Sequence, residues 1–436
     1  MSLDLAHKTK LRIFKLSWII LMFGTISDLI ITERLTFPIR LSSIALMIYI
    51  LTFMFIADLK NIKNLLLDKS TLLIICTLGL LLITAFISSI FSNMSRTALN
   101  VTFFRYTLYF ACFIITLAHT KNFEEARTFL LRSFIFFNLF IIISCFFDFY
   151  IPRFNRILIN HFGHMEGRHS LYLVPSGFVT DSDLTAFSIA LSYLLVILHF
   201  DKFKLKYFLY FFSLPAGFIF GMLASRSALI VIISICIFFF IFKYIERKKL
   251  LISLSIFFVI QLLTPQTQAR IGQFFNKTYI EDEMTTGRPM IWRAAFIAFQ
   301  TSPVIGIGSA VFFLESRDFL TFAGEEISGH KGPAINSDDY WKMDRTNPHS
   351  IIFTMLAEYG LVGLLLFLCL LVIQYRFMIK NKMYVSLVFI SGLLFVSLLS
   401  NYAPYYRYYM LICIVLYILN KDNMLVPKKE NLLTNK

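Results

Sequence analysis

Residues 71–92 read TLLIICTLGLLLITAFISSIFS, a stretch without a single charged side chain. A helix that crosses the hydrocarbon core of a bilayer needs about 20 mostly apolar residues, because every backbone polar group must be satisfied inside the segment. This stretch is long enough and apolar enough to meet that requirement. It predicts a membrane-spanning helix, and with it an integral membrane protein.

The composition of the whole chain agrees with this class. Of the 436 residues, 58% are hydrophobic and only 15% are charged, and the mean hydropathy is +0.72, which excludes an ordinary water-soluble domain. The six cysteines are scattered through apolar runs, so we expect neither a disulfide framework nor a cysteine metal site. The net charge of +15 lies in short loops between apolar runs, where it orients membrane helices, so we expect no nucleic-acid binding.

About twelve apolar runs qualify as membrane spans, and they predict an all-α, polytopic integral membrane protein. They lie near residues 14–33, 40–57, 71–92, 100–119, 129–151, 183–200, 207–224, 227–243, 249–264, 350–373, 383–400 and 404–420. Lys and Arg collect in alternate loops, which predicts that both termini are cytoplasmic. We therefore divide the chain into helices 1–9 over residues 1–264, a large periplasmic loop over 265–349, and helices 10–12 with a cytoplasmic tail over 350–436.

Three candidate site residues fall on the outer side in this topology. Arg226 lies at the outer edge of the membrane in ASRSALI, where a guanidinium either faces an anion or snorkels to lipid phosphate. Arg288 begins a helical pattern inside the outer loop, and His349 precedes the span that starts at Ser350. Two arginines can neutralise a diphosphate, and a neutral imidazole can accept a proton from a hydroxyl, although a lone His is more often just an interfacial residue.

Two further ionisable residues are candidates for supporting roles. Arg105 lies near an expected outer helix end and has the same two readings as Arg226. Glu358 is an intramembrane carboxylate about 13 Å along the helix from His349, on the opposite face. We expect no metal and no cofactor, because HFGHMEGRHS at residues 161–170 lacks a supporting set of ligands and no Gly-rich phosphate loop is present.

The segment from His349 onward resembles the hallmark of the O-antigen ligase family: His349 and Ser350, nine residues, and then Gly360-Leu-Val-Gly363. The segment TTGRPMIWRAAFIAFQTSPVIGIG, residues 285–308, resembles the outer-loop segment of that family, in which an Arg after Gly opens a helix. The segment around Arg226 resembles the family's arginine at the outer end of a middle span. The order of the three motifs along the chain also agrees with the family.

The resemblance implies a bacterial inner-membrane glycosyltransferase that inverts the anomeric centre without a metal. Its donor would be an undecaprenyl-diphosphate-linked glycan, with the diphosphate at Arg226 and Arg288 and the acceptor hydroxyl at His349. The acceptor would be the lipid A-core oligosaccharide in an O-antigen ligase, or the growing lipid-linked glycan in an O-antigen polymerase, and we favour the ligase. Outside the enzyme class, a transporter or flippase of a lipid-linked glycan is the remaining alternative, but such proteins place functional charges near the bilayer midplane.

Overall fold

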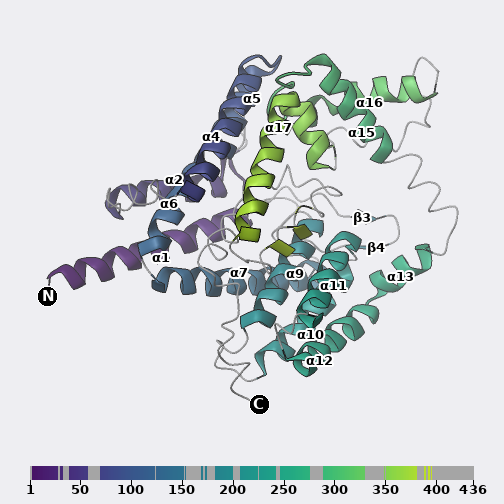
Figure 1. The fold of residues 1–436 in the computed structure, drawn as a ribbon. Helices are drawn as coiled ribbons and strands as arrows, with labels where there is room; N and C mark the ends of the chain where they lie inside the picture. Colours follow the sequence, from purple (N-terminus) through teal and green to yellow (C-terminus); the bar gives the residue numbers. More distant parts are fainter. Residues whose placement is uncertain are drawn as a thin grey trace.

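The computed structural model is built almost entirely of helices (Figure 1). It describes residues 2–27, 30–32, 39–56, 69–122, 124–151, 153, 168–169, 172–173, 182–199, 207–223, 225–241, 246–274, 288–328, 348, 350–380, 387–388, 391–392 and 394. For some of these only the backbone is described, among them Arg105, Arg226 and Arg288. His349, the expected span at 404–420 and the C-terminal tail lie outside the described residues.

The N-terminal half contributes both long and short helices and two short strand pairs. The helices are α1 (Ser2–Ser27), α2 (Leu41–Ile56), α4 (Lys69–Ile90), α5 (Ser95–Val101), the π-helix η1 (Thr102–Thr107), α6 (Leu108–Asn122), α7 (Glu124–Tyr150) and α9 (Ser182–His199). Strands β1 (Ile30–Thr32) and β2 (Ile39–Arg40) pair antiparallel, as do β3 (Arg168–His169) and β4 (Tyr172–Leu173).

The second half continues with helices of two kinds. Three apolar helices come first: α10 (Phe208–Leu223), α11 (Arg226–Ile241) and α12 (Arg247–Leu262). The short, more polar helix α13 (Pro265–Phe274) follows them. The segment after α13 contains α15 (Arg288–Thr301) and α16 (Val311–Ser328), and α17 (Ile351–Lys380) follows it. The helical pattern expected from Arg288 to Gln300 is thus confirmed as α15.

The structure confirms that the protein is helical and apolar enough for a membrane. Among the described residues, three helical stretches are long and apolar enough to cross one: Leu72–Ile90 in α4, Thr128–Tyr150 in α7, and α17. Large apolar side chains point outward on α4 and α17, among them Leu73, Ile83 and Leu365, as expected of surfaces that meet lipid. The count of twelve spans and the placing of a periplasmic loop stay predictions.

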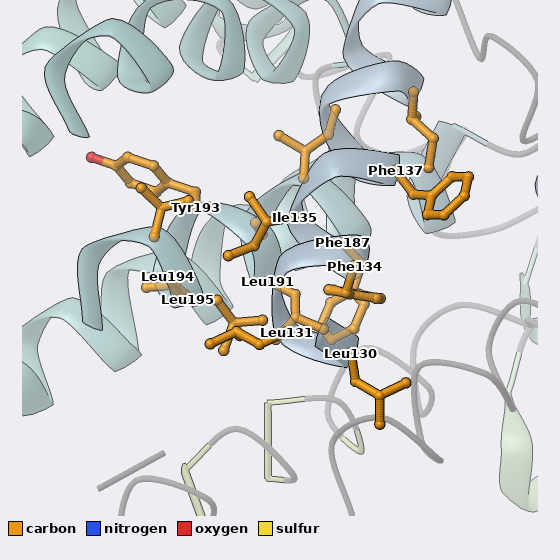
Figure 2. Packing of buried hydrophobic residues seen from close by; sticks show 14 of the residues in the cluster. Leu130, Leu131, Phe134, Ile135, Phe137, Phe187, Leu191, Tyr193, Leu194 and Leu195 are labelled. Carbon is orange, nitrogen blue, oxygen red and sulfur yellow. The ribbon is translucent and has the colours of Figure 1, made fainter. Parts of the chain in front are cut away.

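The larger hydrophobic core joins α7 and α9 to the neighbouring helices. Figure 2 shows Leu131, Phe134 and Ile135 of α7 beside Phe187 and Leu191 of α9, and all five side chains are buried. Some polar side chains pair inside this core: Trp18 donates its indole N–H to the hydroxyl of Ser133 at 3.1 Å, and the hydroxyls of Tyr193 and Ser253 lie 2.7 Å apart.

Two glycines bring α10 and α12 close together. Gly217 and Gly221 are one turn apart on α10, and a Cβ atom at Gly217 would lie 2.5 Å from the backbone oxygen of Phe257 on α12. Small residues at this spacing let helix backbones pack tightly in a membrane, where the hydrophobic effect does not drive helices together.

A smaller, separate core lies between α15, α16 and the beginning of α17. Its buried members are mostly small or aliphatic, with one aromatic ring: Met290, Ile291, Ala294, Ala295, Ala298, Phe312, Leu320, Ala323 and Ala357. The apolar stripe of α15 therefore packs against protein. The sequence of α15 alone is equally compatible with a helix lying along the membrane interface.

Candidate functional site

Helix α17 is broken at Gly360, where the apolar sequence predicted one continuous span. Gly360 has φ 65° and ψ −163°, a conformation open essentially only to glycine, and it divides α17 into an initial segment, residues 351–359, and a long segment, residues 361–380 (Figure 1). The last carbonyl groups of the initial segment and the first N–H groups of the long segment consequently lack partners inside their own helix. Apolar periodicity runs through Gly360 unchanged, so it could not reveal the break.

The loop that leaves α15, residues 303–308, supplies those missing partners, and we call it the strap. Ile307 and Gly308 donate their backbone N–H groups to the carbonyl oxygens of Ala357 and Glu358, at 2.9 and 3.1 Å. In return, Leu361 and Val362 donate to the carbonyl oxygens of Pro303 and Val304, at 2.9 and 3.2 Å. The strap therefore caps both helix ends at the break.

Two glycines make this approach of backbone to backbone feasible. Gly306 in the strap has φ 76°, and a Cβ atom there would meet the carbonyl carbon of Glu358 and the nitrogen of Tyr359. A Cβ atom at Gly360 would meet the carbonyl group of Val304. The motif Gly360-Leu-Val-Gly363 thus has a structural reason, because any larger residue at Gly360 would push the strap out of the break.

A buried hydroxyl network ties the strap to the N-terminal helices. The hydroxyl of Thr102, the first residue of η1, lies 2.8 Å from the hydroxyls of both Ser89 on α4 and Ser309 just beyond the strap. Ser88 donates its hydroxyl to the carbonyl oxygen of Glu358 at 2.6 Å. Because all four side chains are buried, the end of α4, the π-helix and the break form one connected polar centre.

The same centre brings together the sequence neighbours of the two supporting candidates. Tyr359 donates its hydroxyl to that of Tyr106 at 2.7 Å, and the two rings meet edge to face. Arg105 directly precedes Tyr106 in η1, and Glu358 directly precedes Tyr359. Glu358 is buried, with 3% of its surface exposed. The contact between Tyr106 and Tyr359 joins η1 to the initial segment of α17, and the supporting roles of Arg105 and Glu358 stay predictions.

Helices α15 and α17 begin side by side. The indole of Trp292 stacks on the ring of Phe353, with ring centroids 5.4 Å apart and the planes 14° from parallel. At the other end, the chain leaving α15 reaches Ala357 through the strap. The two helices therefore run in the same direction, with their first turns at the same end.

This arrangement determines where two of the expected site residues lie along the backbone. Arg288 is the first residue of α15, one turn before Trp292. His349 itself is outside the described residues, but its neighbours Pro348 and Ser350 are buried at the start of α17. Two adjacent helix N-termini present unpaired N–H groups and the positive ends of two helix dipoles, which favours binding of an anion.

The third expected residue is not brought to this place by any contact that the structure describes. Arg226 is the first residue of α11, which packs against α9 and α12. A helix start is the position that we expected for it, but its convergence with Arg288 stays a prediction.

Helix α16 closes the small core and adds negative charge beyond it. Phe312 and Phe319 stack with their ring planes 9° from parallel, which anchors α16. The pKa of Glu315 is raised, mainly because partial burial disfavours the charged form and secondarily because Asp318 is close. Among the described residues no group of ligating side chains could hold a metal ion.

Comparison with protein families identifies the part of the chain that contains these features. Residues 210–368 match the model of a family described as O-antigen ligase, and this range includes α15, the strap and the break in α17. No curated protein and no solved structure matches the chain. The match includes the positions of Arg226, Arg288 and His349, whereas Arg105 lies before it. Residues 210–368 are therefore similar to the O-antigen ligase family.

Proposed function

We propose that the protein is a membrane glycosyltransferase that moves an O-antigen glycan from undecaprenyl diphosphate to the lipid A-core oligosaccharide. The observation that carries the proposal is that α15 and α17 begin side by side. Arg288 is the first residue of α15, and His349 lies in the sequence just before α17. An anionic diphosphate at two helix N-termini would be held by backbone N–H groups and by the guanidinium of Arg288. The family match over residues 210–368 supports the same class of reaction.

The proposed chemistry needs only groups of this chain and the two substrates. His349 accepts the proton of the acceptor hydroxyl while the hydroxyl oxygen bonds to the anomeric carbon of the glycan. The bond from that carbon to the diphosphate oxygen breaks, and the electron pair leaves with undecaprenyl diphosphate. Arg288, together with Arg226, stabilises the charge that develops on the leaving group, and attack opposite to it inverts the anomeric centre.

The membrane arrangement is part of the proposal. About twelve spans with both termini in the cytoplasm would put the segment 265–349 on the periplasmic side of a bacterial inner membrane. The donor is anchored in the bilayer by its lipid, so a site at the edge of the apolar helices is accessible to it.

The test is the surface glycan profile of cells that lack this gene, read on a gel that resolves lipopolysaccharide by chain length. Loss of all core-attached glycan, with chains accumulating on the lipid carrier, is expected of a ligase. A core that carries a single repeat unit would identify a polymerase instead. An unchanged profile would reject glycan transfer.

Point variants then test the site itself. We expect Arg288→Ala and His349→Ala to reach the membrane at normal levels and to abolish transfer, because each removes a group that meets the reacting atoms. Arg293→Ala is the matched control, since Arg293 lies on the same helix with its guanidinium over the ring of Phe296 at 5.5 Å. Normal glycan display by both test variants would reject this site.

A further inference from the structure

The strap turns two apolar side chains away from the protein. Pro303 and Val304 are both exposed, and Val304 exposes 61% of its surface. Their backbone is fixed from the other side, because Leu361 and Val362 donate N–H groups to the carbonyl oxygens of these two residues. The exposure of Val304 is therefore a consequence of the way in which the strap caps the break.

The turn after α4 extends this apolar surface. Ile90 and Phe91 expose 56% and 73% of their surfaces. The next residue, Ser92, lies against the strap, since a Cβ atom at Gly308 would meet the Ser92 side chain at 2.8 Å. The turn and the strap are thus neighbouring parts of one surface. We call its exposed apolar residues the rim: Ile90, Phe91, Pro303 and Val304.

The rim lies at the ends of two apolar stripes that face outward along membrane spans. Figure 1 shows that α4 and the long segment of α17 both reach the break. Positions three, four or seven apart share a face of a helix, so the exposed apolar side chains of each helix form a single stripe. They are Leu361, Leu365, Leu368 and Val372 on α17, and Leu73, Leu80, Ile83 and Ile87 on α4. Such a stripe on a spanning helix meets acyl chains, and the rim continues both stripes.

The two spans determine the depth of the rim. Leu72–Ile90 in α4 has 19 residues, and the long segment of α17 covers residues 361–380. At a helix rise of about 1.5 Å per residue, each is about 30 Å long, which matches the thickness of the hydrocarbon core. Both have one end at the break, and their other ends carry Lys69 and Lys380. A crossing by either helix therefore puts the rim at one edge of the hydrocarbon core, with the two lysines at the opposite edge.

Helix α16, just beyond the strap, presents a different surface. Its exposed side chains include Arg317, Asp318 and Thr321. Charged groups of this kind are costly in contact with acyl chains and belong in water. Phe322 is exposed beside them, and a single apolar side chain is ordinary on a surface that faces water. The apolar surface therefore ends at the strap.

We propose that the rim is inserted into the bilayer, where the acyl chains of one leaflet cover Pro303 and Val304. The segment between α13 and α17 thus returns to the membrane at the strap, while α16 stays in water. With cytoplasmic termini, as the sequence predicts, this is the outer leaflet. Acyl chains also keep water from the four backbone hydrogen bonds at the break, which strengthens them. The inference does not depend on the proposed function.

The first experiment identifies what covers the strap. The full-length protein carries the photoreactive residue p-benzoylphenylalanine in place of Val304, Leu365 or Thr321, and is reconstituted into phosphatidylethanolamine–phosphatidylglycerol vesicles with alkyne-tagged acyl chains. Leu365 in the stripe of α17 is the positive control, and Thr321 on α16 is the negative control. We expect irradiation to attach lipid at position 304 as efficiently as at 365, and far less at 321. Lipid at 365 with none at 304 would overturn the proposal, as would equal labelling at 304 and 321.

The second experiment uses small substitutions, so that a bulky probe cannot decide the result. Thermal unfolding in the same vesicles is compared for Val304→Asp, Val304→Ala and Thr321→Asp. We expect Val304→Asp to melt at a lower temperature than the other two, because it puts a carboxylate against acyl chains. If Val304, which exposes 61% of its surface, faced water, it would tolerate this change. Equal melting temperatures of the two aspartate variants would therefore overturn the insertion of the strap.

Discussion

Replacing Gly360 by alanine is expected to dismantle the junction between the strap and α17. Alanine at φ 65° and ψ −163° enters a region that costs about 1–3 kcal/mol for a residue with a Cβ atom. The new atom would also overlap the carbonyl group of Val304, which moves the strap and weakens the four backbone hydrogen bonds that cap the break. At about 1 kcal/mol net for each of the four bonds, added to the backbone strain, the loss in the free energy of unfolding is about 5–7 kcal/mol if all four bonds break.

The assay is unfolding of the purified protein in detergent, with glycan transfer measured in parallel. Gly272→Ala is the control, because a Cβ atom at Gly272 would meet nothing within 4 Å inside the helix α13, where alanine is preferred to glycine by about 1 kcal/mol. We expect the control to be as stable as the wild-type protein or more so. Equal stability of Gly360→Ala and Gly272→Ala would refute the reasoning about the break.

Two further substitutions test the centre from other sides. Trp292→Ala removes the stack on Phe353, so we expect it to cost about 3 kcal/mol of stability and to abolish transfer. Trp292→Phe keeps a ring and should retain part of the stability and part of the transfer. Normal transfer by the alanine variant would contradict the paired helix starts. Thr102→Val breaks the buried hydroxyl network and should lower the free energy of unfolding by about 1–3 kcal/mol. The control Thr321→Val removes an exposed hydroxyl on α16 and should change it by less than about 0.5 kcal/mol. Equal effects of the two variants in thermal unfolding would count against the network.

Sequence reasoning succeeded where the signal was local. The apolar run at residues 71–92 became α4, the pattern after Arg288 became α15, and the run at residues 249–264 lies almost entirely within α12. Each of these predictions depended only on residues that are neighbours along the chain, since helical backbone bonds close within a few residues.

The candidate site was predictable only in part, because its contacts join distant residues. The residues around Gly360 do not indicate that residues 303–308 cap the two helix ends there. The only local signal of a close backbone approach was the glycines, in GIG at residues 306–308 and in Gly360-Leu-Val-Gly363. Likewise, Thr102–Thr107 reads as part of an ordinary apolar helix. In the structure it is a π-helix whose side chains contact residues more than 200 positions away, such as Ser309.

The distance in sequence between these partners has a consequence for how the protein is made. Ser88 and Glu358 are 270 positions apart, so the junction at the break cannot close while the ribosome is still producing the segment between them. Membrane helices synthesised early must wait, with the polar ends of α4 and η1 uncovered, until α17 has entered the bilayer.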